Sequence, residues 1–160
     1  MSAGKKALLL IILILILDQA LKVWVKTNMT IGEDIPLLGR IGMLHFIENN
    51  GMALGMEIGG KTGKLFLSVF RIAAILAIGW FLNSIIRKKA SLGLILAVSA
   101  IFAGAVGNMI DSAFYGMIFS ESFHQPAVLF PPGGGYSSFL HGRVVDMFYF
   151  PLINTTWPDW

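Results

Sequence analysis

Three long apolar runs constrain what this chain can fold into more than any other feature of its sequence. They cover residues 7–25, 65–86 and 92–111. A run of about 19 residues reaches about 28 Å as an α-helix, which is enough to cross the hydrocarbon layer of a bilayer. We therefore predict a membrane protein built as an α-helical bundle with three transmembrane helices.

The composition supports this fold class and excludes several others. Hydrophobic residues make up 56% of the chain and charged residues 13%, whereas about a quarter of a soluble domain is charged. The net charge is +3, but the lysines and arginines flank the apolar runs, so membrane topology explains them and we expect no nucleic-acid partner. Because the chain has no cysteine and its histidines form no ligand motif, we expect neither a metal nor a cofactor.

Positive charges predict the orientation of the helices. Lys5 and Lys6 precede the first run as in a secretory signal peptide, but the run continues past Asp18 and Lys22 without a small-residue cleavage site, so we predict a retained helix. These lysines and residues 87–89 fall on the same side of the predicted bundle, which the positive-inside rule makes cytoplasmic.

The segments 27–64 and 112–160 then lie on the outer side of the membrane. Gly, Pro, Asp and Asn recur in the first segment, which predicts strands and turns that form a small β-rich cradle. In the second segment, residues 120–141 are rich in Gly, Pro and Ser and predict a flexible surface loop. The closing residues, 143–160, are aromatic and amphiphilic and suit the membrane–water boundary. Residues 1–160 therefore form a single integral-membrane domain.

Five polar residues near the outer side need an explanation. Asp18 and Lys22 share a helix face, and Asn108 and Asp111 stand three residues apart at the end of the third run. Charges at membrane depth are costly and functional by default, although residues near a helix end can also reach water. Asp146 falls on the same side as Asp111. Two carboxylates can divide acid and base roles, so the pair is either catalytic or structural.

Four blocks carry a resemblance to a known family: "DQALK" (18–22), "NNGMALG" (49–55), "GNMID" (107–111) and "GRVVDMF" (142–148). In this order they resemble the lipoprotein signal peptidase family, also called signal peptidase II, over nearly the whole chain. The resemblance implies a metal-free aspartic endopeptidase of the bacterial inner membrane. Such an enzyme removes signal peptides from diacylglyceryl-modified prolipoproteins at the outer surface, so its partners are a lipidated prolipoprotein and membrane lipids.

The resemblance also implies roles for individual residues. Asp146 matches a catalytic carboxylate, and a second group supports the site: Asp18, Lys22, Asn108 and Asp111. Three residues are expected to bind substrate: Asn49, Gly51 and Arg143. On its own, the "NNG" stretch is more typical of a tight turn between two strands than of a substrate contact.

The chain departs from the family pattern in three ways. The second catalytic aspartate belongs to a later motif, F-N-x-A-D, which opens a fourth transmembrane helix in the family and has no counterpart up to Trp160. We therefore expect a C-terminally truncated chain with weak or no activity, unless Asp111 and Asp146 themselves form the pair. Ser112 stands where an arginine is common, for which Arg143 or Arg71 could compensate, and the segment before "GRVVD" is longer than in the compact family form.

Two other functions fit parts of the pattern. A non-catalytic membrane protein that binds lipidated or apolar peptides would use the same groove with structural aspartates. A transporter or proton-relay subunit would use Asp18, Arg71 and Asp111 as intramembrane charges. The second is disfavoured because Asp111 lies at a helix end and no broken-helix repeat is present in the sequence.

Overall fold

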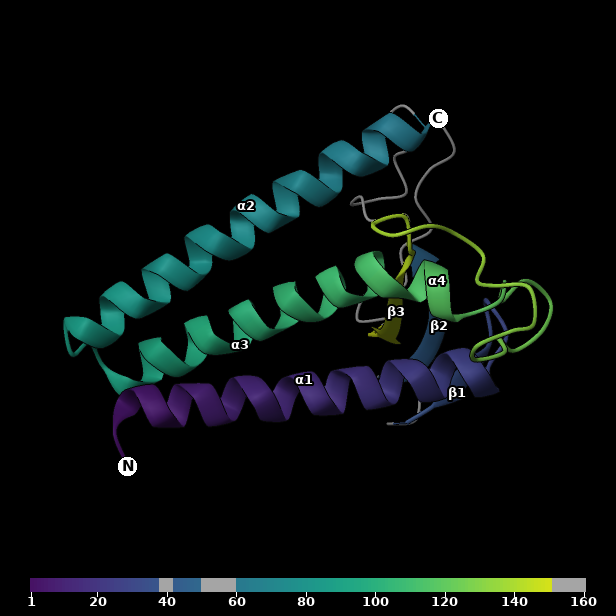
Figure 1. Ribbon diagram of the computed structural model, residues 1–160. Coiled ribbons are helices and arrows are strands. Elements are labelled where there is room, and N and C mark those ends of the chain that lie inside the picture. Colours follow the sequence, from purple (N-terminus) through teal and green to yellow (C-terminus); the bar gives the residue numbers. More distant parts are fainter. Residues whose placement is uncertain (38–41, 50–59, 151–160) are drawn as a thin grey trace, which may run out of the picture.

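The computed structural model describes residues 1–37, 42–49 and 60–150, which include three long helices (Figure 1). These are α1 (Ala3–Asn28), α2 (Gly60–Arg87) and α3 (Leu92–Ile110). All three are long and apolar enough to cross a membrane. The three predicted spans are therefore confirmed, and α1 and α2 begin several residues earlier than their apolar runs.

Serine caps define where two of the helices begin. The hydroxyl of Ser2 accepts from the backbone N of Lys5 at 3.3 Å, and that of Ser91 accepts from the N of Leu94 at 3.4 Å. A serine in this position satisfies one of the free N–H groups of the first helical turn. The start of α1 and the α2–α3 connection lie at the same end of the bundle (Figure 1). The basic residues flanking them therefore gather at one end, as the sequence predicts.

Helix α3 packs against both α1 and α2. Its approach to α1 depends on Gly107, where an added Cβ would lie 2.5 Å from Oδ2 of Asp18. Small residues allow helix backbones to approach closely in membranes. Large apolar side chains cover the outside of the bundle, as a lipid-facing surface requires, for example Leu9, Ile16, Leu76 and Trp80.

The third span does not end at residue 111. It continues through a π-helical turn, η2 (Asp111–Tyr115), and a short helix, α4 (Gly116–Ile118). The turn buries Asp111, Ser112, Ala113 and Tyr115. Such π-helical turns are rare and occur frequently at functional sites.

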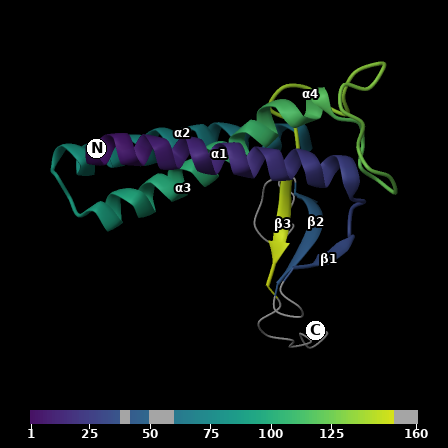
Figure 2. The same ribbon diagram turned by 90° about the horizontal axis from the view of Figure 1, so that it is seen from below.

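A three-stranded antiparallel sheet lies at the other end of the bundle from the N-terminus (Figure 2). It contains β1 (Asp34–Pro36), β2 (Met43–Asn49) and β3 (Val144–Tyr149), in that order. The register places Asn49 opposite Val144, with an irregularity between Leu44 and Ile47. The β-rich cradle is thus confirmed. Its third strand comes from the segment in which the sequence analysis expected only an amphiphilic stretch.

An apolar core joins this sheet to the outer end of α1. It contains Val25 of α1, Met29 directly after that helix, Phe46 of β2, and Val145 and Met147 of β3. Tyr115 and Phe119 complete it from the end of the third span, with their rings in an edge-to-face contact at 4.9 Å. The core fixes the sheet to the helices, and therefore fixes where the polar residues of β2 and β3 lie.

The segment between Ile118 and β3 is packed more closely than a surface loop. Phe119 forms a β-bridge with Leu129, and the N of Tyr136 donates to the carbonyl of Phe119 at 3.0 Å. Ser122 and Ala127 are buried. The Gly, Pro and Ser content correctly indicated irregular structure, but composition alone did not reveal these buried anchors.

Candidate functional site

An inner polar cluster lies between α1 and the end of α3. The ammonium of Lys22 lies 2.7 Å from Oδ2 of Asp111, and both side chains are almost completely buried. The same Nζ donates to Oδ1 of Asn108 at 2.9 Å and lies 3.2 Å from Oδ2 of Asp18. All four residues that the sequence analysis placed in a supporting group are therefore in direct contact around one ammonium.

Gln19 and Tyr115 belong to the same cluster and were not predicted. Nε2 of Gln19 donates to Oδ1 of Asp111 at 3.1 Å, and Oε1 of Gln19 accepts from the Tyr115 hydroxyl at 3.1 Å. Gln19 stands inside the "DQALK" block, which was the available signal for it. Tyr115 follows its block by four residues and carried no such signal.

Asp111 is the residue that connects this cluster to the sheet. Its Oδ2 accepts from the backbone N of Val145 at 3.2 Å, and its two oxygens also receive Lys22 and Gln19. A buried carboxylate needs such partners to offset its lost hydration. Because its described bonds all go to these groups, Asp111 has the surroundings of a structural brace that joins α1, α3 and β3.

Asp146 has different surroundings, although it stands next to Val145. Side chains alternate along a strand, so Val145 enters the core while Asp146 is exposed. Oδ2 of Asp146 accepts from Nδ2 of Asn49 at the end of β2, at 3.2 Å. The structure therefore brings together the predicted catalytic carboxylate and a predicted substrate-binding amide. Gly51, the other substrate-binding residue of that block, lies outside the described residues.

Arg71 of α2 reaches the same end of the bundle. Its Nη1 donates to the hydroxyl of Ser112 at 2.7 Å, and its guanidinium is attracted electrostatically by Asp146 and by Asp111. The carbonyl of Ser112 accepts from the N of Gly142 at 2.9 Å. Gly142 has no room for a side chain, because an added Cβ would lie 2.3 Å from the carbonyl oxygen of Asp111.

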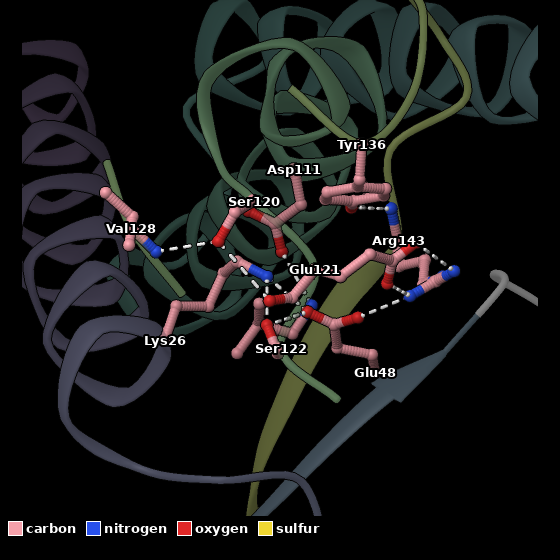
Figure 3. A network of polar contacts seen from close by, with 10 residues as sticks. Lys26, Glu48, Asp111, Ser120, Glu121, Ser122, Val128, Tyr136 and Arg143 are labelled. Carbon is pink, nitrogen blue, oxygen red and sulfur yellow. Dashed lines mark hydrogen bonds and ion pairs between the residues drawn. The ribbon is translucent and has the colours of Figure 1, made fainter. Parts of the chain in front are cut away.

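An outer polar cluster lies one helical turn further along α1 (Figure 3). Nζ of Lys26 contacts Oε1 of Glu48 and donates to the hydroxyl of Ser122 at 2.9 Å, and that hydroxyl donates to Glu48 at 2.8 Å. The Lys26 and Glu48 side chains are 1% and 2% exposed. Lys26 also lies over the ring of Phe119, 5.1 Å from its centroid. No sequence motif predicts this cluster, because its members stand far apart along the chain.

Arg143 belongs to the outer cluster. Its Nη1 lies 3.0 Å from Oε2 of Glu48 and 2.7 Å from Oε2 of Glu121, and its guanidinium stacks 5.0 Å from the ring centre of Tyr136 (Figure 3). Burial opposes its charge, but these two carboxylates outweigh burial and raise the Arg143 pKa. Since its guanidinium is held by Glu48 and Glu121, a role in substrate binding stays a prediction.

Burial and charge act in opposite directions on Glu48. Burial alone would raise the pKa of this carboxyl, but Lys26, Arg143 and Ser122 outweigh it and leave the pKa below its ordinary value of 4.5. Burial also raises the pKa of Tyr136, whose hydroxyl accepts from the N of Arg143 at 2.7 Å. Glu48 is therefore an ionised carboxylate held away from water, beside a neutral Tyr136.

An apolar groove between α2 and α3 lies beside these polar residues. Its lining includes the residue after Arg71 and the residue after Ser112. All its members are apolar: Ile72, Ile75, Leu76, Val106, Met109, Ile110, Ala113 and Phe114. Phe114 also contacts Phe139 in an edge-to-face arrangement, with ring centres 5.8 Å apart. Such a lining suits an acyl chain or an apolar peptide.

Comparison with known proteins identifies the family to which the chain belongs. A family model described as signal peptidase (SPase) II matches residues 10–160. The chain is 49% identical over 158 residues to a lipoprotein signal peptidase of Porphyromonas gingivalis, and the match covers 98% of this chain and 68% of that protein. It is 36% identical over 152 residues to a lipoprotein signal peptidase of Amoebophilus asiaticus, covering 93% of this chain and 61% of that protein.

The fold is also similar to solved structures. A bacterial membrane enzyme, solved at 2.3 Å resolution, superimposes with a TM-score of 0.62 and 24% identity, covering 92% of this chain and 71% of that chain. A second structure of a bacterial membrane enzyme, at 1.9 Å, gives a TM-score of 0.61. At this level of identity the likeness concerns the fold alone.

Proposed function

The chain belongs to the signal peptidase II family, and from this premise we propose that it is an aspartic endopeptidase that cuts signal peptides from diacylglyceryl-modified prolipoproteins. One observation carries the assignment of the site. Asp146 is an exposed carboxylate on β3, hydrogen-bonded to Asn49, next to a residue whose backbone is fixed by the inner cluster. A rigidly held carboxylate that water can reach has the properties of a general base.

In the proposed reaction Asp146 and a second carboxylate divide the chemistry. One takes a proton from the attacking water, and the other protonates the amide nitrogen that leaves the scissile bond. Asp111 is a poor second carboxylate, because it is fully buried and both of its oxygens already accept from other groups. We therefore assign that role to the F-N-x-A-D motif of the family and propose that residues 1–160 alone cut slowly or not at all.

The surroundings of Asp146 support a lipidated substrate. Asn49, at the end of β2, offers its amide to an extended substrate peptide, which would bind along the sheet as an added strand. The apolar groove between α2 and α3 offers a lateral opening for acyl chains. We place the protein in the bacterial inner membrane with its N-terminus in the cytoplasm. The supports are the basic residues at one end of the bundle and β3, the strand that carries Asp146, at the other.

A cleavage assay on a diacylglyceryl prolipoprotein in detergent tests the proposal. It compares residues 1–160 with a version extended by a fourth helix that carries F-N-x-A-D. We expect only the extended version to cut, and Asp146→Asn to abolish the cutting. Asp34→Asn is the matched control, because Asp34 is an exposed strand carboxylate that contacts His45. Cutting by both versions would instead make Asp111 and Asp146 the pair.

The same assay separates the proposal from a binding function, which the apolar groove also favours. If neither version cuts but both retain a lipidated peptide, and Asp146→Asn leaves that retention unchanged, the protein is a binding protein with structural aspartates. In that case the proposed peptidase activity is wrong.

A further inference from the structure

Arg71 is a cation at membrane depth that the mechanism above does not use. It lies in the membrane-spanning part of α2 and is half-buried. A charged side chain in this position is costly and is retained where it has a partner or a function. Its contact with Ser112 Oγ, at 2.7 Å, supplies a dipole but no countercharge.

Two carboxylates attract the Arg71 guanidinium, and they differ in how far they are already engaged. Asp111 lies 2.7 Å from the ammonium of Lys22 and accepts from Gln19 and from the backbone of Val145. Asp146 accepts from a neutral amide, that of Asn49. Asp146 is therefore the carboxylate whose charge Arg71 is placed to balance.

The backbone contacts around Arg71 lead to the same carboxylate. Ser112, which receives the guanidinium, holds Gly142 through its carbonyl at 2.9 Å. Ser68, one turn before Arg71, donates to the carbonyl of Leu140 at 3.1 Å. Both contacts attach α2 and η2 to the short segment that leads into β3. A shift of Arg71 would therefore be transmitted through this segment to β3, the strand that carries Asp146.

We propose that Arg71, anchored on Ser112, is the positioning residue that orients the Asp146 carboxylate and balances its charge during peptide-bond hydrolysis. This inference rests on the proposed function and deepens it. It assigns to α2 a polar role in addition to its lipid-facing one. It also explains why the turn after Asp111 presents a small hydroxyl, since a larger side chain at residue 112 would occupy the place of the guanidinium.

The test moves the charge instead of only removing it. Three variants are made in whichever version of the protein cuts: Arg71→Met, Arg71→Lys, and the double variant Arg71→Ser with Ser112→Arg, which places the guanidinium on the other side of the same contact. Arg87→Met is the control, because Arg87 is an exposed arginine at the opposite end of α2. For each variant kcat and KM for the lipidated substrate and the melting temperature in detergent are measured.

We expect Arg71→Met to lower kcat about 100-fold with KM changed less than about threefold, since a misplaced catalytic group costs rate more than binding. Arg71→Lys should retain part of the rate, and the double variant should recover at least about a tenth of it. Arg87→Met should match the parent protein.

Several results would overturn the inference while leaving the peptidase activity in place. The first is that the parent cuts and Arg71→Met has the same kcat. The second is that Arg71→Met changes KM alone. The third is that the double variant melts like the parent but remains as slow as Arg71→Met. If no version of the parent cuts, the proposed function falls and this inference falls with it.

Discussion

Two lysines stand one turn apart on α1, and each pairs with a buried carboxylate from a distant part of the chain. Lys22 reaches Asp111 at the end of α3, whereas Lys26 reaches Glu48 on β2. The inner pair joins helix to helix. The outer pair joins a helix to the sheet and, through Ser122, to the segment after α4. The same residue type on the same helix therefore makes two different kinds of connection.

Both pairs hold the same point of the structure. Asp111 accepts directly from the backbone N of Val145, and Glu48 lies opposite Val145 in the register of β2 and β3. Val145 precedes Asp146. The two pairs therefore fix the strand at the residue directly before the carboxylate to which we assign catalysis. The pairs differ in the number of ion pairs that each carboxylate makes. Among the described residues Asp111 forms an ion pair with Lys22, and Glu48 forms ion pairs with both Lys26 and Arg143.

The largest effect is expected when Lys22 is replaced by methionine. Asp111 is fully buried, so removal of its cation leaves an uncompensated charge, which typically costs about 3–5 kcal/mol. We expect a loss of this size in the free energy of unfolding, measured in mixed detergent micelles. The double variant Lys22→Met with Asp111→Asn should recover part of the loss. A single variant as stable as the parent would show that the inner pair does not hold the helices.

The outer pair should be weakened next by Glu48→Gln, and this loss should depend on pH. At pH 7 the variant leaves Lys26 buried without its carboxylate, at a cost of about 3 kcal/mol. Because folding lowers the pKa of Glu48, its contribution is complete above the ordinary value of 4.5 and is lost as pH falls through the lower folded value. The stability gap between parent and variant should therefore be full at pH 7 and close in acid. A gap independent of pH would contradict this assignment.

Lys26→Met should cost less than Lys22→Met, about 2 kcal/mol, because Glu48 keeps Arg143 and the hydroxyl of Ser122. The methionine also keeps apolar contact with the ring of Phe119, over which the lysine lies. Unfolding of the two lysine variants under the same conditions compares the pairs directly. Equal losses of stability would mean that Arg143 does not compensate Glu48 when Lys26 is removed.

The inner pair could be predicted from the sequence, and the outer pair could not. Asp18 and Lys22, and Asn108 and Asp111, are placed by helical spacing within two apolar runs, so their meeting follows once the helices pack. Glu48 and Ser122 meet Lys26 only after the sheet has formed and the segment after α4 has folded back. No local sequence periodicity predicts that this segment folds back onto the sheet. For the same reason the sequence did not predict the position of Tyr115 or the third strand. Long apolar helices, in contrast, can be predicted from composition and length.

The smallest effect is expected from Tyr136→Phe. The change removes the hydroxyl that accepts from the backbone N of Arg143 at 2.7 Å but keeps the ring on which the Arg143 guanidinium lies. A single neutral hydrogen bond contributes about 1 kcal/mol, so the variant should lose about that much stability and retain activity. Tyr149→Phe, at a half-exposed tyrosine of β3, is the control and should lose less. Because Arg143 also binds Glu48, a loss equal to that of Lys26→Met would mean that Tyr136 holds the whole outer cluster and that the ion pairs follow from it.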